Sequence, residues 1–380
     1  MMHNLITLIL CTLFSVSSTA ATRADPAPEA LEIIQELGLQ EAATPIDQHP
    51  RWQPQRVVVS LPASLSARLP GLEPQLLATA AGVELIIDRS EDFSLSAEVL
   101  AAADAIIGLC SPATMDNASA RLLWLHNFTV GMDRCAGLPE AQFEDRVFSN
   151  NKRLSGPAIA EHSIAMLLSL ARGLPAYQRA QANSTWDRAL AARVQFGEVK
   201  GKTLLVVGLG GIGTQIAWRA HGLGMRVIAT RNSSHDGPDY VEYVGLSNEL
   251  FTLAAKADVV ISTLPLTSKT TGLFDQAFFR TIKPGAIFIS VGRGKSTVTS
   301  DLATALESGH LYGAGLDVTD PEPLEAQSPL WQMDNVIITP HVSAAGQDSL
   351  RRTAIITVEN LRRYLAGEPL LNIVDLRAGY

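Results

Sequence analysis

The chain has 380 residues, of which 47% are hydrophobic, and it carries a formal net charge of −8. Its length and apolar content are sufficient for two packed domains. No long basic block is present, so we expect no nucleic-acid partner.

The amino terminus predicts a leader over residues 1–24. An apolar run at 5–16 is too short for a typical spanning helix, and small residues follow it as they do at a cleavage site. We expect a secretory signal, which implies export, and no stable membrane insertion. The alternatives are an apolar helix on a membrane surface or a misassigned start, and the chain is cytoplasmic if the segment is not used. The leader is followed by a connector predicted at 25–51, with one short helix at 29–37.

Residues 52–153 are predicted to form the first part of a small domain, with buried strands between helices. Residues 154–340 are predicted to form a larger domain that opens with a helix over 158–174. The strands are expected at 56–60, 102–108 and 122–125 in the first, and at 202–207, 226–230, 258–262, 286–290, 315–318 and 336–339 in the second. The alternation of strands and helices predicts an α/β fold with a Rossmann-type, doubly wound parallel sheet.

Charged and sulfur-containing residues give little sign of a further site. The pairs Arg351–Arg352 and Arg362–Arg363 lie in a helix-like tail and are interpreted as a solvated face. Cys110 and Cys135 form no recognisable disulfide framework and lack metal-ligand spacing, so we interpret them as inert packing and expect no metal.

A glycine fingerprint follows the strand at 202–207 and predicts a dinucleotide site. Gly208 permits a tight turn, Gly210 lets the backbone approach a pyrophosphate, and Gly213 lets helix and strand pack closely. The helix that begins here, with Gly211 and Ile212 in its first turn, offers free N–H groups to the phosphates.

The next strand end indicates which dinucleotide is bound. The sequence there is Ala-Thr-Arg-Asn-Ser-Ser over 229–234, without the Asp or Glu that usually binds the ribose hydroxyls of NAD. Arg231 is suited to a 2′-phosphate, and Asn232 and Ser233 to further hydrogen bonds, so NADP(H) is favoured over NAD(H). The alternative is that Arg231 stacks on adenine or faces solvent.

Three residues near the carboxyl ends of later strands suggest catalysis. Arg293, between two glycines, is suited to binding a carboxylate or a ketone oxygen. His341 is suited to acid–base catalysis, and a nearby carboxylate such as Glu322 would fix its tautomer. Alone, each of the three has a structural explanation. Together with a nicotinamide they predict hydride transfer.

From about residue 56 onward, the chain resembles the D-isomer-specific 2-hydroxyacid dehydrogenase family, and within it the NADP-preferring glyoxylate/hydroxypyruvate reductase-like subgroup. The segments that carry the resemblance are Trp-Leu-His-Asn-Phe-Thr-Val-Gly-Met-Asp at 124–133, Ala-Glu-His-Ser-Ile-Ala at 160–165, Val-Gly-Leu-Gly-Gly-Ile-Gly at 207–213, Leu-Pro-Leu-Thr at 264–267, Val-Gly-Arg-Gly at 291–294, Gly-Leu-Asp-Val-Thr-Asp-Pro-Glu-Pro at 315–323 and Thr-Pro-His at 339–341.

The resemblance implies that Arg293, Glu322 and His341 are catalytic, with Arg293 also binding substrate. It implies that the backbone at Val130 and Gly131 binds the substrate carboxylate. Residues implied to border the cofactor are Thr263, Leu264, Pro265, Val291 and Asp317, the last through the nicotinamide amide.

The resemblance also implies a flavodoxin-like substrate domain made of 52–153 and 341–380, a site between the domains, and a homodimer. The expected reaction is NADPH-dependent reduction of a small 2-oxo acid, such as glyoxylate or hydroxypyruvate, to the D-2-hydroxy acid. One alternative is a dinucleotide-sensing, non-enzymatic binding protein like the corepressors of this fold. Another is a formate or phosphite dehydrogenase, against which Arg231 counts because NAD is expected there. Arg231 and the leader depart from the usual family pattern.

Overall fold

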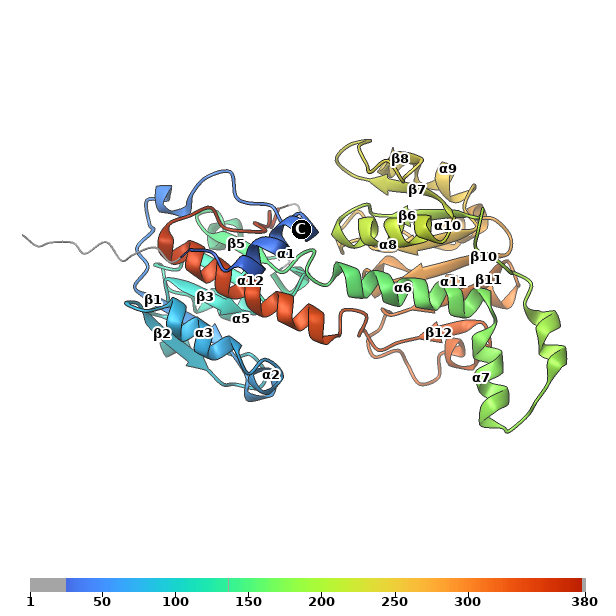
Figure 1. Cartoon of the computed structure of the whole chain (residues 1–380), viewed down its shortest axis with the longest axis horizontal. Coiled ribbons are helices and arrows are strands. Elements are labelled where there is room, and N and C mark those ends of the chain that lie inside the picture. The colour runs from blue at the N-terminus through green and yellow to red at the C-terminus, as the bar shows by residue number, and fades with distance from the viewer. Residues whose placement is uncertain (1–24, 136, 378–380) are drawn as a thin grey trace, which may run out of the picture.

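The structure, a computed structural model, describes residues 25–135 and 137–377 and has two lobes, each built on its own parallel sheet (Figure 1). The leader predicted at 1–24 lies outside the described residues, so export stays a prediction. In the described ranges no helix has the length and apolarity needed to cross a membrane.

The smaller lobe has five parallel strands in the order β2-β1-β3-β4-β5, the flavodoxin-like order. The strands are β1 (Arg56–Ser60), β2 (Glu84–Asp88), β3 (Ala105–Gly108), β4 (Trp124–Asn127) and β5 (Val147–Asn150). Its helices are α2 (Ala63–Arg68), α3 (Leu72–Thr79), α4 (Ala97–Leu100), α5 (Pro112–Asp116) and the C-terminal α12 (Gln347–Ala366). Helix α12 packs against α3, and its Tyr364 ring stacks on Trp124 of β4 at 4.9 Å between centroids. The carboxyl end of the chain therefore completes the core of this lobe.

The larger lobe has seven parallel strands in the order β12-β11-β10-β9-β6-β7-β8. They are β6 (Thr203–Val207), β7 (Arg226–Arg231), β8 (Tyr243–Leu246), β9 (Val259–Ser262), β10 (Ala286–Ser290), β11 (Leu311–Leu316) and β12 (Val336–Ile338). Helices α6 (Gly156–Ala171) and α8 (Gly211–Gly222) cover one face, and α9 (Leu250–Ala254), α10 (Gln276–Thr281) and α11 (Thr299–Glu307) cover the other. The strand order reverses between β6 and β9, where doubly wound sheets bind their ligands.

The predicted strands agree with the structure where the sequence is a short apolar run. Three strands were not predicted: β2 and β8 lie at sheet edges and are partly exposed, and β5 ends in polar residues. The strand predicted at 315–318 is β11 and begins four residues earlier, at Leu311. Its glycines weaken the strand signal, but Gly315 lets α6 approach, since a Cβ there would lie 2.8 Å from Met166 Sδ.

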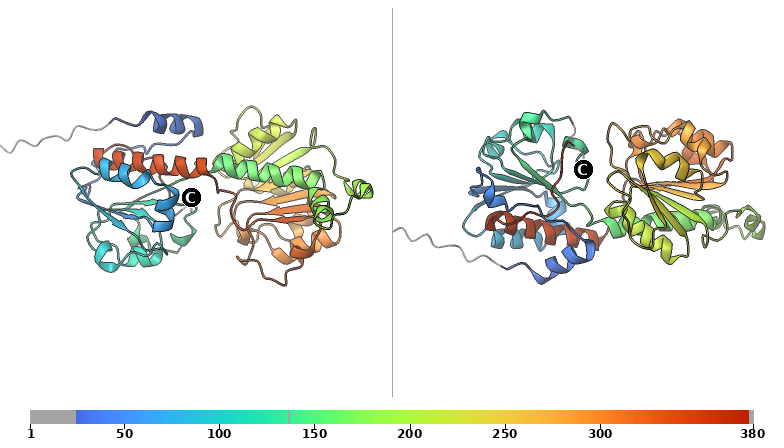
Figure 2. Two further views of the ribbon diagram at one scale, coloured as in Figure 1. Left: turned by 60° about the horizontal axis from the view of Figure 1, so that its bottom comes forward. Right: turned by 90° about the horizontal axis from the view of Figure 1, so that it is seen from above.

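The segment 25–51 was predicted as a connector, but part of it packs onto the smaller lobe. Helix α1 (Pro28–Leu37) places Ile33 and Leu37 in a buried cluster with Ile356 of α12, and Arg351 of α12 pairs with Glu29. Figure 2 shows α1 beside α12, with α12 and α6 nearly end to end across the junction of the lobes. Composition alone did not reveal this packing because half of it is provided by the other end of the chain.

The interpretation of the tail arginines as a solvated face is wrong for Arg362 and Arg363, which are only 8% and 5% exposed. Their Nε atoms donate to the two oxygens of buried Glu359, at 2.9 and 2.7 Å. The hydrogen bonds of Arg362 with Glu359 and Glu368 raise the pKa of Arg362. Buried charges persist when they are paired in this way.

The expectation of two inert thiols is also wrong, because Cys110 and Cys135 form a disulfide with a Cα–Cα distance of 5.7 Å. Cys110 lies just beyond β3, and Cys135 ends a short 3₁₀ turn, Asp133–Cys135, after β4. The two residues are 25 positions apart, and the neighbouring strands β3 and β4 bring them together. The described residues contain no group of three His, Cys, Asp or Glu arranged to hold a metal.

His126 in β4 is completely buried in the smaller lobe. Its ring nitrogens lie 2.9 Å from Ser149 Oγ and 3.3 Å from Thr357 Oγ1 of α12. Burial lowers the pKa of His126 from 6.5 to about 4. The folded protein therefore holds a neutral imidazole, whereas the unfolded chain binds a proton near pH 6.5.

This difference predicts loss of stability in weak acid. The His126 contribution is complete above pH 6.5 and declines as the pH falls toward 4, by roughly 2 kcal/mol between pH 7 and 5. His126→Asn retains a polar group without a titrating one, so its unfolding free energy should fall less over this range in denaturant titrations. His221→Asn, at an exposed position, should keep the wild-type slope. If the unfolding free energy of all three proteins changed equally with pH, His126 would not be the cause of the acid sensitivity.

Candidate active site

The glycine loop lies where β6 passes into α8. Gly208 has φ +102°, a conformation that side chains rarely adopt, and a Cβ at Gly213 would overlap the Gly208 carbonyl oxygen. Helix α8 begins at Gly211, so its first N–H groups and the positive end of its dipole face the loop. The backbone is thus shaped for close approach by an anion such as a pyrophosphate.

The segment that follows β9 contacts this loop, and the segment that follows β10 packs against the one after β9. Thr263 Oγ1 donates to the Gly208 carbonyl at 2.7 Å, and a Cβ at Gly292 would lie 2.6 Å from the Leu264 carbonyl oxygen. Pro265 accepts a hydrogen bond from Thr270 Oγ1 at 2.7 Å, which closes the following turn, and Val291 is buried beside Gly292. The structure therefore brings the predicted cofactor residues of three strand ends together.

At the end of β7, Arg231 Nη1 donates to the Asp236 carbonyl at 2.9 Å. Asn232 Oδ1 accepts from Ser247 Oγ at 3.1 Å, and Ser233 is exposed. Arg231 forms no ion pair with a carboxylate anywhere in the described ranges. A guanidinium beside hydroxyl and amide groups can donate charge-assisted hydrogen bonds to an anion.

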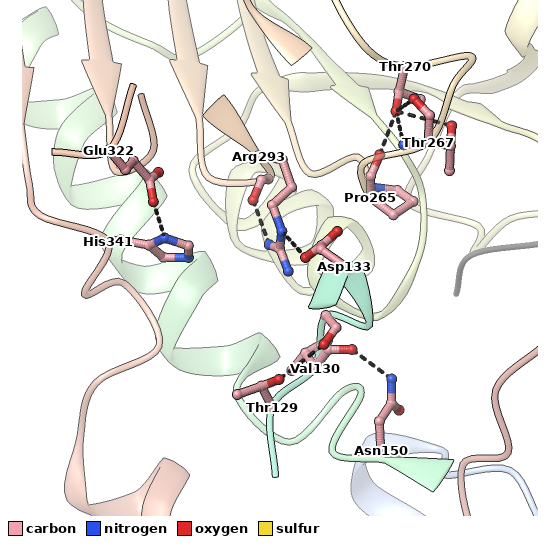
Figure 3. Close-up of polar contacts among 12 residues, drawn as sticks. Thr129, Val130, Asp133, Asn150, Pro265, Thr267, Thr270, Arg293, Glu322 and His341 are labelled. Carbon is pink, nitrogen blue, oxygen red and sulfur yellow. Dashed lines mark hydrogen bonds and ion pairs between the residues drawn. The ribbon is translucent and has the colours of Figure 1, made fainter. Parts of the chain in front are cut away.

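Arg293 reaches from the larger lobe to the smaller one (Figure 3). Its Nε donates to Asp133 Oδ2 at 2.7 Å and its Nη1 to the Gly292 carbonyl at 2.8 Å. Its Nη2 lies against Gly131, where a Cβ would overlap it. Asp133 stands two residues after Gly131, but no sequence pattern indicated its role because the contact joins residues 160 positions apart.

The turn at 129–131 is held by two amides from neighbouring strand ends. Asn150 Nδ2 donates to the Val130 carbonyl at 2.6 Å, and Asn127 Nδ2 donates to the Gly131 carbonyl at 3.1 Å. Within the described part of the chain, the N–H groups of Val130 and Gly131 have no hydrogen-bond acceptor. With the carbonyls occupied, the turn can offer its N–H groups, together with Arg293, to a carboxylate.

His341 and Glu322 form a hydrogen-bonded pair, with 3.0 Å between His341 Nδ1 and Glu322 Oε2. The other Glu322 oxygen accepts from the Thr319 N–H at 3.1 Å, which fixes the carboxylate. His341 has φ +53°, and non-glycine residues in this region often mark functional sites. Both side chains are about half exposed, so the second ring nitrogen remains available to a ligand.

Asp317 lies beneath the His341 turn. It accepts from Thr339 Oγ1 at 2.6 Å and from the N–H groups of Val342 and Ser343 at 2.9 and 3.0 Å. Burial by itself would raise the pKa of Asp317, but these hydrogen bonds outweigh it and the pKa is lowered. The side chain is fully buried, and its contacts position the His341 turn. The expected contact with a nicotinamide amide stays a prediction.

The contact between Gly131 and Arg293 yields a sharp prediction. In Gly131→Ala the new methyl group displaces the guanidinium, so kcat/KM for a 2-oxo acid should fall by about 100-fold or more, while the melting temperature changes little. Gly71→Ala is a matched control, since its Cβ would meet only the Gln75 side chain at 3.5 Å. If Gly131→Ala had the wild-type kcat/KM, the position of the Arg293 guanidinium against Gly131 would not matter for activity.

Comparisons with known proteins show related sequences and structures of the same fold. A profile described as D-isomer specific 2-hydroxyacid dehydrogenase, NAD binding domain, matches residues 164–343. A structure of a D-isomer specific 2-hydroxyacid dehydrogenase from Xanthobacter autotrophicus, in complex with NADPH and MES, has a TM-score of 0.70 at 28% identity, covering 86% of this chain and 100% of that one. An NADPH-dependent glyoxylate/hydroxypyruvate reductase from Sinorhizobium meliloti, in complex with NADP and sulfate, also has a TM-score of 0.70, at 27% identity and the same coverage.

The sequence relatives differ in how much of their length is matched. The chain spans 59% and 40% of the length of two curated relatives that it matches at 38% and 33% identity. A glyoxylate reductase from Korarchaeum cryptofilum is 30% identical over 299 residues, which is 77% of this chain and 86% of that protein. Because the Korarchaeum relative is matched over most of its length at this identity and the family profile matches as well, the chain belongs to the D-isomer specific 2-hydroxyacid dehydrogenase family.

Proposed function

We propose that the protein reduces small 2-oxo acids of the glyoxylate and hydroxypyruvate class to D-2-hydroxy acids, with NADPH as the electron donor. The observation that carries the proposal is the arrangement of His341 with Glu322, Arg293 and the turn at 129–131, which face one another across the junction of the lobes (Figure 3). The glyoxylate reductase of Korarchaeum and the Sinorhizobium enzyme support this substrate class.

Each residue has a distinct part in the proposed reaction. The N–H groups of Val130 and Gly131 bind the substrate carboxylate, and Arg293 binds and polarises the 2-oxo group. Protonated His341 gives its Nε2 proton to the developing alkoxide, while Glu322 on Nδ1 stabilises the imidazolium. The reduced nicotinamide, when bound, supplies the hydride. Asp317 holds the His341 turn in place.

The preference for NADPH rests on the end of β7. Arg231 has no carboxylate partner in the described ranges, and no Asp or Glu stands within 229–234 to bind a ribose diol. The NADPH and NADP complexes of the Xanthobacter and Sinorhizobium proteins favour the same choice. The competing function is a dinucleotide-sensing binding protein, which would need the glycine loop but not the paired His341 and Glu322.

Purified protein should oxidise NADPH in the presence of glyoxylate or hydroxypyruvate, with a higher specificity constant than for NADH. His341→Ala should lower kcat by roughly 10²–10⁴-fold because the general acid is lost, with the Kd for NADPH little changed. The measurement is NADPH absorbance together with direct cofactor titration. No turnover on any 2-oxo acid, with tight NADPH binding, would favour the binding protein. Equal specificity constants for both cofactors would refute the NADPH preference alone.

We also propose that the protein is a homodimer, and that an arm of the larger lobe forms the interface. Helix α7 (Leu174–Ala182) and the 3₁₀ segment Arg188–Arg193 project from the lobe in Figure 1. Trp186 between them is 94% exposed, and Leu174 is 44% exposed. Burying such apolar side chains against a second copy of the chain would stabilise the dimer.

Trp186→Asp tests this assembly, because a charge in the interface opposes association. Light scattering coupled to gel filtration should give a dimer for the wild type and a smaller mass for the variant at the same concentration. Trp331→Asp, at an exposed tryptophan outside the arm, should leave the mass unchanged. A monomeric wild-type protein would contradict the proposal.

A further inference from the structure

Arg153 stands out at the crossover between the lobes because its backbone is in an unusual conformation. It lies between β5 and α6 and has φ +75°, in the left-handed region that a long side chain rarely adopts. Such a residue persists only when its surroundings hold it there, and it often marks a functional site. No sequence pattern indicated a role for Arg153.

Two elements outside the crossover hold this residue. Arg153 Nη1 donates to the Leu37 carbonyl at the end of α1, at 3.2 Å, where a cation also complements the helix dipole. The next residue, Leu154, is fully buried between α1 and α12, and its carbonyl accepts from Arg352 Nε at 2.8 Å. The N-terminal helix therefore fixes the direction in which the Arg153 side chain leaves the backbone.

The Arg153 side chain lies directly on the glycine loop. A Cβ at Gly211, the first residue of α8, would be 2.6 Å from Arg153 Cγ and 3.3 Å from its Cα. Gly211 thus leaves room for the aliphatic part of Arg153. The same loop adjoins the end of β7, because the N–H groups of Gly208 and Leu209 donate to the carbonyl of Thr230, the residue before Arg231, at 3.2 and 2.8 Å. Burial, and after it the positive charge of Arg231, lower the pKa of Arg153.

The positive charges of Arg153 and Arg231 are not neutralised by carboxylates of the described residues. Neither Arg153 nor Arg231 has a carboxylate within ion-pairing distance in the described ranges, and the same holds for half-buried Lys152 beside them. Like charges held together repel one another unless an anion lies between them. An arginine pair at the start of a helix is suited to a phosphate, which accepts charge-assisted hydrogen bonds from both guanidinium groups.

We infer that Arg153 is a second binding residue for the 2′-phosphate of NADP(H), which it holds together with Arg231. The inference rests on the proposed use of NADPH and deepens it, since a residue from outside the Rossmann sheet then takes part in choosing the cofactor. Helix α1 contributes to cofactor selection indirectly, because it holds Arg153 over the glycine loop.

The test separates binding from folding by using the backbone conformation. Glycine accepts φ +75° without strain, and this gain offsets the lost hydrogen bond to Leu37, so the cofactor-free Arg153→Gly protein should melt close to the wild type. Its Kd for NADPH, measured by fluorescence titration without substrate, should rise by about 10- to 100-fold, while the Kd for NADH changes by less than about threefold. Arg153→Lys keeps the charge but not the planar fork and should recover part of the loss. Arg172→Gln, at the far end of α6, should leave both dissociation constants unchanged.

Several outcomes would overturn the inference. An unchanged Kd for NADPH in Arg153→Gly would remove Arg153 from the site, and parallel losses for NADPH and NADH would show a contact with the pyrophosphate or a packing effect instead. If the wild type prefers NADPH and the variant keeps that preference, only this inference fails. If the wild type itself binds both cofactors equally, the proposed NADPH preference fails and the inference with it.

Discussion

The contact of Arg293 with Gly131 and Asp133 is the constraint on which the candidate site depends. Arg293 comes from the larger lobe and the other two from the smaller one, and the guanidinium fits only because Gly131 has no side chain. Asp133 Oδ2 orients the guanidinium through Nε, which leaves Nη2 toward the turn at 129–131. A displacement between the lobes would therefore separate the cation from the N–H groups that we propose bind the substrate carboxylate with it.

Much of the surrounding structure positions groups rather than offering them to a ligand. The Cys110–Cys135 disulfide ties the turn that carries Asp133 to the end of β3. Asp317 receives three hydrogen bonds from the segment around His341 and holds an imidazole whose backbone is in the left-handed region. Preorganisation of this kind is what acid–base and electrostatic catalysis require, because the groups need not rearrange during the reaction.

The ends of the chain contribute more than their composition indicates. Helix α1 and helix α12 pack on each other and on the crossover at 151–156, and the ion pair of Glu29 with Arg351 joins the two helices. Because the crossover leads into α6 and borders the glycine loop, this packing connects the N-terminal segment to the proposed cofactor site. The buried Arg362, Arg363 and Glu359 show why a run of charges cannot be assigned to solvent from sequence alone.

The sequence by itself determined the fold class, most strands of the larger sheet and the glycine loop. It also indicated Arg293, Glu322 and His341 as the candidate catalytic residues. These features are local, since an apolar β-branched run or a glycine fingerprint acts over a few residues. Parallel strands then bring their carboxyl ends to one edge of a sheet, so the site could be predicted from strand ends. The tertiary structure alone decided the disulfide, the burial of the tail arginines, the packing of α1, the position of Asp317 beneath the His341 turn, and the contacts of Asp133 and Arg153. Each of these joins residues far apart in the chain or depends on burial, which no local pattern records.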